Sequence, residues 1–289
     1  MHYSVPAAAT VAILLTFSGA IRVRATDTGS GPPDRVSVQQ AWQTIEEMAA
    51  SNNPQHRKYS AAAFALLAQK HSRALESAKK LLHSDHEAEV RAFMAAALGQ
   101  EQTRAAIPAL REALDDQAAV VAFAAAKALW NMQDHSGAII FQEVLTGTRK
   151  DSQGLVNSYL ADARHKMHNP KALAMLGVKE ATGAFFGPAA MAISFAQESL
   201  KDKGAAGRAY AAGALAEDRS KKSREILENA LQDSSPLVRA AACRSIAILR
   251  DRGSLVYLEP LLNDNDEGAR AMASAAYIRL REPVSRRKG

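Results

Sequence analysis

The sequence predicts an all-α protein, an α-solenoid in which helix pairs stack side by side. Three observations point to this class. Arg208, Arg239 and Arg270 fall 31 residues apart, each beside small apolar residues, and such a period with two helices per unit is typical of solenoids. Of the 289 residues, 47% are hydrophobic but only 6% are aromatic, because alanine, the strongest helix former, supplies much of the apolar content. Alternating runs of valine or threonine are nearly absent, so we expect essentially no sheet.

The chain opens with an apolar stretch that predicts a signal peptide over residues 1–25. Residues 5–20 read VPAAATVAILLTFSGA, which has the length of a signal-peptide core and is short for a membrane span of roughly 20 residues. Small residues that suit cleavage follow, but no lysine or arginine precedes the stretch, so an uncleaved membrane anchor remains an alternative. We therefore expect an exported protein, periplasmic or secreted. Residues 26–36 are polar and rich in Gly and Pro, which is typical of a flexible linker.

Residues 37–147 are predicted to form an N-terminal capping helix followed by helix pairs. The stretch Ser37–Gln40 resembles a capping box that opens the first helix, whose bulky apolar face includes Trp42 and indicates a cap over the first repeat. Asn53-Pro54 then places an N-cap residue before a proline at the first helical position. In each unit, one apolar-periodic helix leads through a short polar turn to a second helix that ends in leucine.

The period is lost over residues 148–200, and three interpretations of this irregular segment stay open. It is a degenerate repeat that joins two blocks, an insert that binds a ligand or partner, or a segment that touches a membrane. The repeat pattern resumes over residues 201–282, where Ile246 belongs to the buried stripe of one helix. The chain ends in a basic tail, residues 283–289, and we expect fraying to reach back to Arg279.

An aspartate stands six residues before each of several first-helix arginines, and this spacing predicts a charge ladder along the solenoid. The aspartate falls in the turn that enters a first helix, where its carboxylate can accept backbone N–H bonds, and the arginine lies one turn inside. Stacking would bring the aspartate of one turn near the arginine of a neighbouring helix. Asp116 keeps the acid where Ala122 has replaced the base. The predicted ladder residues are Asp85, Arg91, Asp202, Arg208, Asp233, Arg239, Asp264 and Arg270.

These features resemble HEAT repeats, closest to the short PBS-lyase HEAT-like variety. The D-x5-R spacing, first helices of the VRAAA type and short second helices carry the resemblance, which covers roughly Asn53–Gly147 and Asp202–Leu280. It implies that the chain is similar to protein-binding scaffolds, the role of most relatives that share only the repeat, while a few are bilin lyases or metal-dependent hydroxylases. The hydroxylases use repeated His-Glu pairs as iron ligands, and this chain has one such pair, His86-Glu87, so we do not expect that activity. No further motif points to a bilin lyase.

No catalytic, cofactor or metal site is predicted. His83 and His86 lie in one inter-repeat turn, and His165 and His168 form a second pair, but a zinc or iron site needs three or four convergent ligands. The single cysteine, Cys243, lies within an alanine-rich helix, where a small buried residue is expected rather than a reactive thiol. The net charge of +6 is modest and does not argue for nucleic-acid binding.

The predicted function is that of a non-enzymatic scaffold that binds another protein in the cell envelope or outside the cell, without a cofactor. Its binding surface is expected on the concave side, lined by the second helices in such folds. Membrane contact through the N-terminal segment or the basic tail is a further option. The alternative function is that of a HEAT-like lyase or other small-molecule-binding enzyme in which residues 171–200 form a pocket wall. The candidate residues of the binding face are Lys79, Lys80, Arg104, Arg111, Lys221, Lys222 and Arg224.

Overall fold

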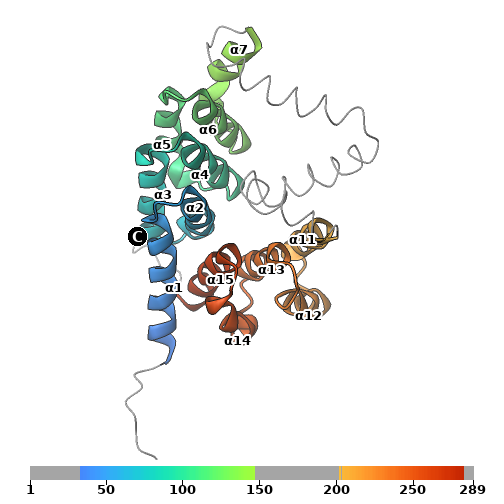
Figure 1. The fold of residues 1–289 in the computed structure, drawn as a ribbon. Helices are drawn as coiled ribbons and strands as arrows, with labels where there is room; N and C mark the ends of the chain where they lie inside the picture. Colours follow the sequence, from blue (N-terminus) through green and yellow to red (C-terminus); the bar gives the residue numbers. More distant parts are fainter. Residues whose placement is uncertain (1–32, 147–201, 203, 283–289) are drawn as a thin grey trace, which may run out of the picture.

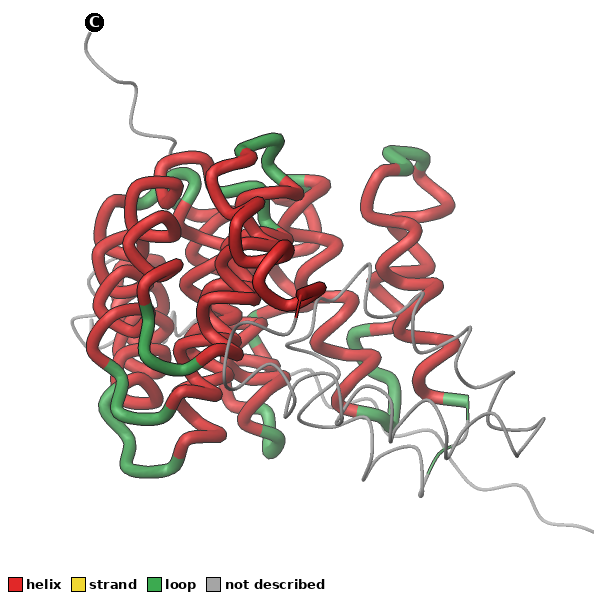
Figure 2. Tube along the Cα trace, turned by 90° about the horizontal axis from the view of Figure 1, so that it is seen from above, coloured by secondary structure: helices red, strands yellow, loops and turns green. Residues whose placement is uncertain are grey.

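The computed structural model describes residues 33–146, 202 and 204–282, and every regular element within these ranges is helical, with no strand (Figure 1, Figure 2). The prediction of an all-α solenoid is therefore confirmed. No helix in these ranges is both long enough and apolar enough to cross a membrane. Several predictions concern residues outside them: the signal peptide, most of the linker, the irregular segment, the His165/His168 pair and the basic tail.

The helices form two blocks of pairs, each pair with a first helix that carries the alanine-rich run and a second helix after a tight turn. The N-terminal block contains α1 (Pro33–Ala49), α2 (Pro54–Ala68), α3 (Ser72–Ser84), α4 (Ala88–Gln100), α5 (Ile107–Glu112), α6 (Ala119–Asn131) and α7 (Ala138–Thr146). The C-terminal block contains α11 (Ala205–Ala214), α12 (Lys221–Ala230), α13 (Pro236–Leu249), α14 (Leu255–Leu258) and α15 (Glu267–Arg281). Short 3-10 turns are Arg104–Ala106, Ala113–Asp115, His135–Gly137, Leu215–Glu217, Arg252–Ser254 and Pro260–Asn263. The first helices are α2, α4, α6, α11, α13 and α15, and the second helices are α3, α5, α7, α12 and α14.

Local capping explains where first helices begin and end. Pro54 occupies the first position of α2, and the side chain of Asn53 accepts the backbone N–H of Gln55 at 2.9 Å. At the other end, α4, α6 and α13 each run into a residue with left-handed backbone, and the next amide donates to a carbonyl five residues back. This closing turn stops the helix and aims the chain at the second helix. The left-handed residues are Gln102, Gln133 and Arg250.

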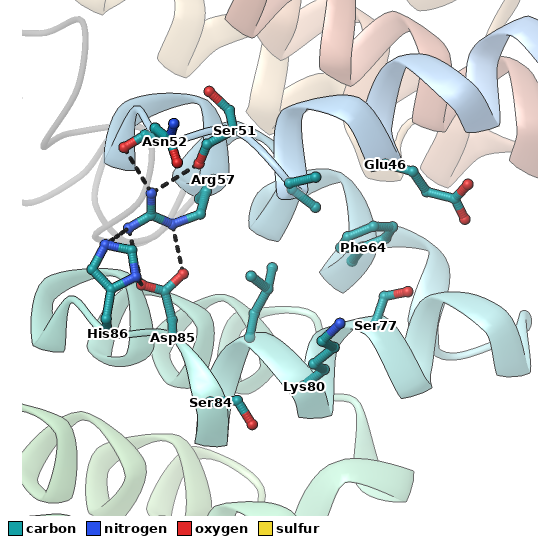
Figure 3. A pocket seen from close by; sticks show the side chains of 13 residues that line it. Glu46, Ser51, Asn52, Arg57, Phe64, Ser77, Lys80, Ser84, Asp85 and His86 are labelled. Carbon is teal, nitrogen blue, oxygen red and sulfur yellow. Dashed lines mark hydrogen bonds and ion pairs between the residues drawn. The ribbon is translucent and has the colours of Figure 1, made fainter.

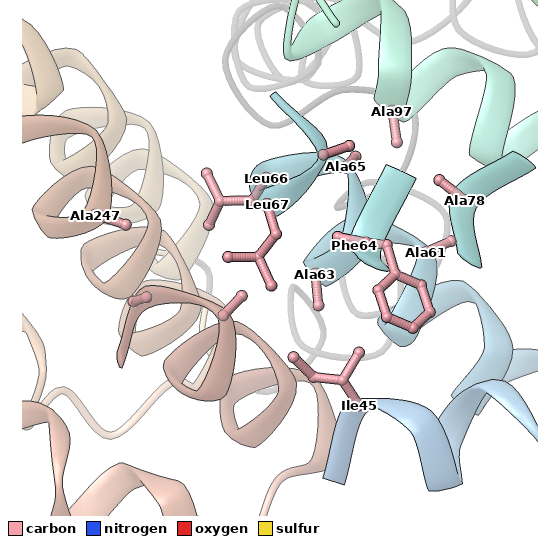
Figure 4. Close-up of a cluster of buried hydrophobic side chains, with 14 of the residues drawn as sticks. Ile45, Ala61, Ala63, Phe64, Ala65, Leu66, Leu67, Ala78, Ala97 and Ala247 are labelled. Atoms are coloured by element: carbon pink, nitrogen blue, oxygen red, sulfur yellow. The ribbon is translucent and has the colours of Figure 1, made fainter. Parts of the chain in front are cut away.

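Small side chains let first helices pack with their backbones almost in contact. A Cβ atom added at Gly99 of α4 would lie 2.6 Å from the Cα atom of Ala128 in α6, so a larger residue does not fit there. Larger side chains fill the space toward the second-helix layer. Figure 4 shows Phe64 and Leu67 of α2 grouped with Ile45 of α1, and all three are fully buried.

The order of the helices in the stack differs from their order in the sequence. α15 packs against α13 on one side and against α1 and α2 on the other (Figure 1). The first helices therefore follow one another as α11, α13, α15, α2, α4 and α6, so the C-terminal block precedes the N-terminal block in space. Bonds over long sequence separations join the blocks: Trp42 donates through Nε1 to Glu282 at 3.0 Å, and His56 pairs with Glu267 at 2.7 Å.

α1 packs against α2 of the first repeat and also against α15, so it stands as the second helix of a composite repeat whose first helix is α15. α15 is the last helix of the described chain, and α1 covers it by burying Trp42 and Ile45 in the shared core. A first helix that carries an apolar stripe toward the second layer must be covered, and the start of the chain supplies the cover. α1 begins at Pro33, inside the predicted linker, so Ser37 lies within the helix and the predicted capping box is wrong.

The stack is bent, with first helices along its inner side and second helices along its outer side (Figure 1). One contact skips two helices of the stack: Arg244 of α13 donates through Nε to Glu101, the residue that ends α4, at 2.8 Å. The expectation that second helices line the concave side is therefore wrong. Alanine and glycine allow first helices to approach one another more closely than second helices can, and a stack bends toward its more closely spaced layer.

Candidate functional site

Four first-helix arginines bind aspartates of the following repeat, each through Nε and Nη2 to the two carboxylate oxygens. Such two-point, charge-assisted bonds are stronger and more directional than single ones. The predicted acids and bases thus come together, and these four two-point bonds join successive units rather than the two residues of one D-x5-R spacing. The pairs, with their shorter N–O distance, are Arg57–Asp85 (2.7 Å), Arg91–Asp116 (2.8 Å), Arg208–Asp233 (2.8 Å) and Arg239–Asp264 (2.7 Å).

The six-residue spacing itself ties the arginine to the backbone of its own turn. Arg91 donates through Nη1 to the carbonyl oxygen of Asp85, and Arg239 does the same to Asp233, both at 2.8 Å. The carboxylate of Asp85 also accepts the backbone N–H of Glu87 at 2.9 Å, which holds the turn before α4. Other aspartates accept the backbone N–H of the residue two positions later in the same way, namely Asp116, Asp202, Asp233 and Asp264. Asp85, Asp116, Asp233 and Asp264 therefore each fix one turn and receive the arginine of the preceding unit.

Arg57 belongs to this ladder, although the predicted spacing did not reveal it. Ser51 stands six residues before Arg57, where the other units have aspartate. The backbone part of the arrangement needs no carboxylate, and Arg57 donates through Nη1 to the carbonyl oxygens of Ser51 at 2.9 Å and Asn52 at 3.0 Å. An alignment that allowed serine at the acidic position would have found it.

The ladder is interrupted where the two blocks meet. Arg270 of α15 donates to the carbonyl oxygen of Asp264, as its counterparts do. The next turn in the stack is the one before α2, where Ser51 replaces the aspartate, so Arg270 finds no ladder carboxylate there. The pair of His56 with Glu267 lies at this junction instead. At the far end of the C-terminal block, Arg208 binds Asp202 of its own turn at 2.6 Å as well as the aspartate of the next unit.

Hydrogen bonds from the arginines keep the ladder carboxylates ionised. The bond from Arg208 lowers the pKa of Asp233, although burial opposes this effect. Burial alone would raise the pKa of Asp116, but the bonds from Arg91 and from the backbone N–H of Ala118 outweigh it, and the pKa of Asp116 is lowered. In the same way, the bond from Arg208 lowers the pKa of Asp202. Burial would also raise the pKa of Asp264, but the bond from Arg239 is the largest of the contributions that together lower it.

A second row of ion pairs runs through the outer layer and uses two residues of the predicted binding face. Arg111 of α5 binds Asp134 at 2.6 Å, and Arg224 of α12 lies 3.7 Å from Asp251. Both aspartates stand at the turn that enters the next second helix and accept a backbone N–H two residues on. Arg111 and Arg224 therefore join successive second helices, as the ladder joins first helices.

The other candidates for the binding face lie on the outer, convex side. Lys79 pairs with Glu76 at 2.9 Å and Lys221 with Glu225 at 3.6 Å, both within their own helices. The remaining three are exposed and make no ion pair within the described part of the chain. They are Lys80, Arg104 and Lys222.

An open hollow of about 400 Å³ lies where the end of α1, the start of α2 and α3 meet (Figure 3). The buried Arg57–Asp85 pair forms one end of it. All the guanidinium nitrogens of Arg57 have partners within the protein. Besides the bonds described above, its Nη2 lies 3.2 Å from Nε2 of His86. Glu46 on the opposite side is held by Arg73 at 2.7 Å, which leaves the exposed Lys80 as the free charge of the hollow. These groups do not form a nucleophile, base and acceptor set.

The histidine and cysteine side chains of the described residues form no metal or thiol site. No group of three or more His, Cys, Asp or Glu side chains within residues 33–146 and 204–282 could hold a metal ion. His83 instead lies 3.4 Å from Glu112. Cys243 is fully buried in α13, and burial raises the pKa of its thiol. Arg279 and Arg281, expected to fray, are part of α15.

Comparisons with known proteins bear on the fold. A family model described as HEAT repeats matches residues 43–130 and 193–278. Among solved structures, the chain is similar to an engineered protein, with 19% identity over 85% of this chain and 96% of that chain and a TM-score of 0.26. It is also similar to the complex of CpcE and CpcF of phycocyanin lyase from Nostoc sp. PCC7120, with 16% identity over 90% of this chain and 100% of that chain and a TM-score of 0.29. These TM-scores are too low to carry an argument. No curated protein matches the chain.

Proposed function

Because the chain belongs to the HEAT-repeat family, we propose that it is a non-enzymatic scaffold that binds another protein along the inner side of its bend. HEAT repeats commonly mediate protein interactions, and solenoids use the concave surface that curvature creates. The observation that carries the proposal is the bond between Arg244 and Glu101, which brings α13 and α4 together across two intervening helices. The first helices thereby line a concave surface contributed by both blocks.

An exposed aromatic side chain on a first helix supports protein binding. Trp130 of α6 is 48% exposed, yet its ring is held edge-to-face by His135 at 4.5 Å and Phe141 at 5.7 Å between centroids. A large aromatic group held in one orientation loses little entropy on binding, and tryptophan is enriched among residues that dominate interface energies. Trp130 is therefore a first-helix residue that we expect to contact the partner, at the α7 end of the N-terminal block.

The experiment is partner capture with the full chain from a cell-envelope extract after mild cross-linking. We expect one protein to recur in independent captures and Trp130→Ala to weaken its recovery. The matched control is Tyr257→Ala, which removes an aromatic side chain that is 44% exposed on the second helix α14. Loss of capture with Tyr257→Ala and not with Trp130→Ala would move the binding surface to the outer side. Repeated absence of any partner, together with turnover of a substrate, would overturn the scaffold proposal.

We propose the cell envelope or the exterior as the location, on the strength of the apolar residues 5–20. N-terminal sequencing of the protein from fractionated cells tests this directly. A mature chain that begins near residue 26 and fractionates with the periplasm or medium supports it, whereas a cytoplasmic chain that retains Met1 contradicts it. The alternative enzymatic function depends on residues 171–200, which lie outside the described residues.

A further inference from the structure

Three arginines lie near one another on the inner side of the bend, and one of them, Arg244, binds the carboxylate of Glu101. Arg244 of α13 binds Glu101 at the end of α4, with Nε and Nη2 each 2.8 Å from the same carboxylate oxygen. Arg279 of α15 donates through Nη1 to the carbonyl oxygen of Leu66 in α2 at 2.7 Å. Arg250, which ends α13, completes the group because its charge acts on Arg279.

The three arginines of this cluster carry more positive charge than the Glu101 carboxylate neutralises. Burial lowers the pKa of Arg279, the carboxylate of Glu101 opposes that effect, and the charges of Arg250 and Arg244 add to it. Arg244 already takes the Glu101 carboxylate, while Arg250 is exposed and has no ion partner within the described ranges. Two of the three guanidinium groups therefore lack a carboxylate.

Arg279 also carries an unused buried donor. Its Nε–H is shielded from solvent and has no hydrogen-bond partner among the residues that the structure describes, and the bond to Leu66 uses one N–H of the guanidinium. A buried donor on a charged group is costly when it is left without an acceptor. The excess charge and the unpaired donor belong to the same cluster, and both would be satisfied by the same chemistry, an anionic oxygen.

Resting on the scaffold function proposed above, we propose that the cluster of Arg244, Arg250 and Arg279 binds an oxyanion carried by the protein partner, either a carboxylate or a phosphorylated side chain. Guanidinium groups match the paired oxygens of both. Within this molecule, one oxygen of the Glu101 carboxylate already binds Arg244. The incoming oxyanion binds Arg279 and Arg250 beside Glu101, and so docks the partner where the two blocks meet.

The probes are inorganic phosphate, the peptide hexaglutamate and hexaglutamine, titrated into the full chain at constant ionic strength with chloride as the balancing anion. The readouts are calorimetry and the shifts of the arginine Nε–H signals in the NMR spectrum. We expect phosphate or hexaglutamate, but not hexaglutamine, to bind and to shift the Arg279 signal. Binding of phosphate alone selects the phosphorylated source, and binding of hexaglutamate alone selects the carboxylate source.

Two variants separate a built site from general attraction to positive charge. Arg250→Asn removes one guanidinium and keeps a residue that tolerates the left-handed backbone, whose φ is 57°. We expect it to weaken binding by about fivefold or more, as loss of a charge-assisted contact does. The matched control is Arg252→Gln, which removes an equal charge from an exposed position two residues away and should leave binding unchanged.

Arg279→Lys keeps the charge but not the planar fork, and should weaken binding as well. Circular dichroism identifies any variant that fails to fold. If Arg279→Lys does not fold, the binding measured with Arg250→Asn, at an exposed position, tests the inference by itself. Equal weakening by Arg250→Asn and Arg252→Gln, or absence of binding to either anion, overturns the inference. The scaffold proposal is judged separately, because a partner captured equally well by the wild type and by Arg250→Asn would leave that proposal standing.

Discussion

The ladder pair in the middle of the stack and the pair at its end have the same geometry in different surroundings. The side chains of Arg57 and Asp85 are 5% and 2% exposed, whereas those of Arg208 and Asp233 are 42% and 16% exposed. Water screens an exposed pair, but removal of one partner from a buried pair leaves a desolvated charge behind. One repeated motif therefore contributes differently to stability according to its place in the stack.

The largest effect is expected when the buried pair is broken. Arg57→Met leaves Asp85 without its counter-charge in the interior and should lower the free energy of unfolding by about 3–5 kcal/mol. Urea unfolding followed by circular dichroism measures the change. The double variant Arg57→Met/Asp85→Leu removes both charges and should recover part of the loss. A cost below about 1 kcal/mol for Arg57→Met would mean that the pair is solvated and that the comparison fails.

A core substitution should show that the two blocks share the same apolar packing although their ladders differ. Ile246 of α13 and Leu129 of α6 occupy matching positions, and they are 1% and 0% exposed. Truncation of either side chain to alanine should cost about 2–5 kcal/mol, because each leaves a cavity between helices. The same urea experiment compares Ile246→Ala with Leu129→Ala. A change below about 0.5 kcal/mol at either site would show that its side chain is not in the core.

The junction between the blocks should lose stability in mild acid. Burial lowers the pKa of His71, against the carboxylate of Glu282, which lies 2.9 Å away, and with a smaller contribution from the charge of Arg279. Since the folded-state pKa lies below the unfolded value of 6.5, the unfolded chain binds the proton more tightly. The contribution of His71 to the free energy of unfolding is therefore fully present above its unfolded pKa of 6.5, and it is lost as the pH falls through the lower folded-state pKa.

Unfolding midpoints at several pH values between 8 and 5 measure this dependence. His71→Gln should flatten the decline, whereas His83→Gln, at an exposed position, should leave it unchanged. A decline of the same size in wild type and His71→Gln would assign the pH dependence to other groups.

The smallest effect is expected at the exposed end of the ladder. Arg208→Met is the same substitution as in the buried pair, but it should change the free energy of unfolding by less than about 1 kcal/mol, because the bonds to Asp202 and Asp233 compete with water. High salt should reduce even this difference. A cost equal to that of Arg57→Met would show that burial does not govern the ladder.

The repeat could be predicted because it is local. Helix pairs, the proline starts and the role of each aspartate in its own turn depend on residues that are neighbours in the chain, as at Asp85 and Glu87. The ladder pairs follow once identical units stack. Arg57 was missed because serine replaces its aspartate, and Arg111 and Arg224 were assigned to a binding face because their partners on the next second helix were not recognised. The arginine cluster gave no signal, since Arg279 of α15 lies on a different helix from Arg244 of α13 and Arg250, which ends that helix.

The sequence by itself determined that the chain forms stacked helix pairs. The alanine runs and the acid–base spacing act over one or two helical turns, and the 31-residue period repeats them along the chain. Only the tertiary structure decided how the stack is ordered and which way it bends. Trp42 and Glu282 are 240 residues apart, and their bond depends on α1 and α15 burying apolar faces against each other. Such an interface is selected by complementary surfaces of whole helices, which local periodicity does not encode.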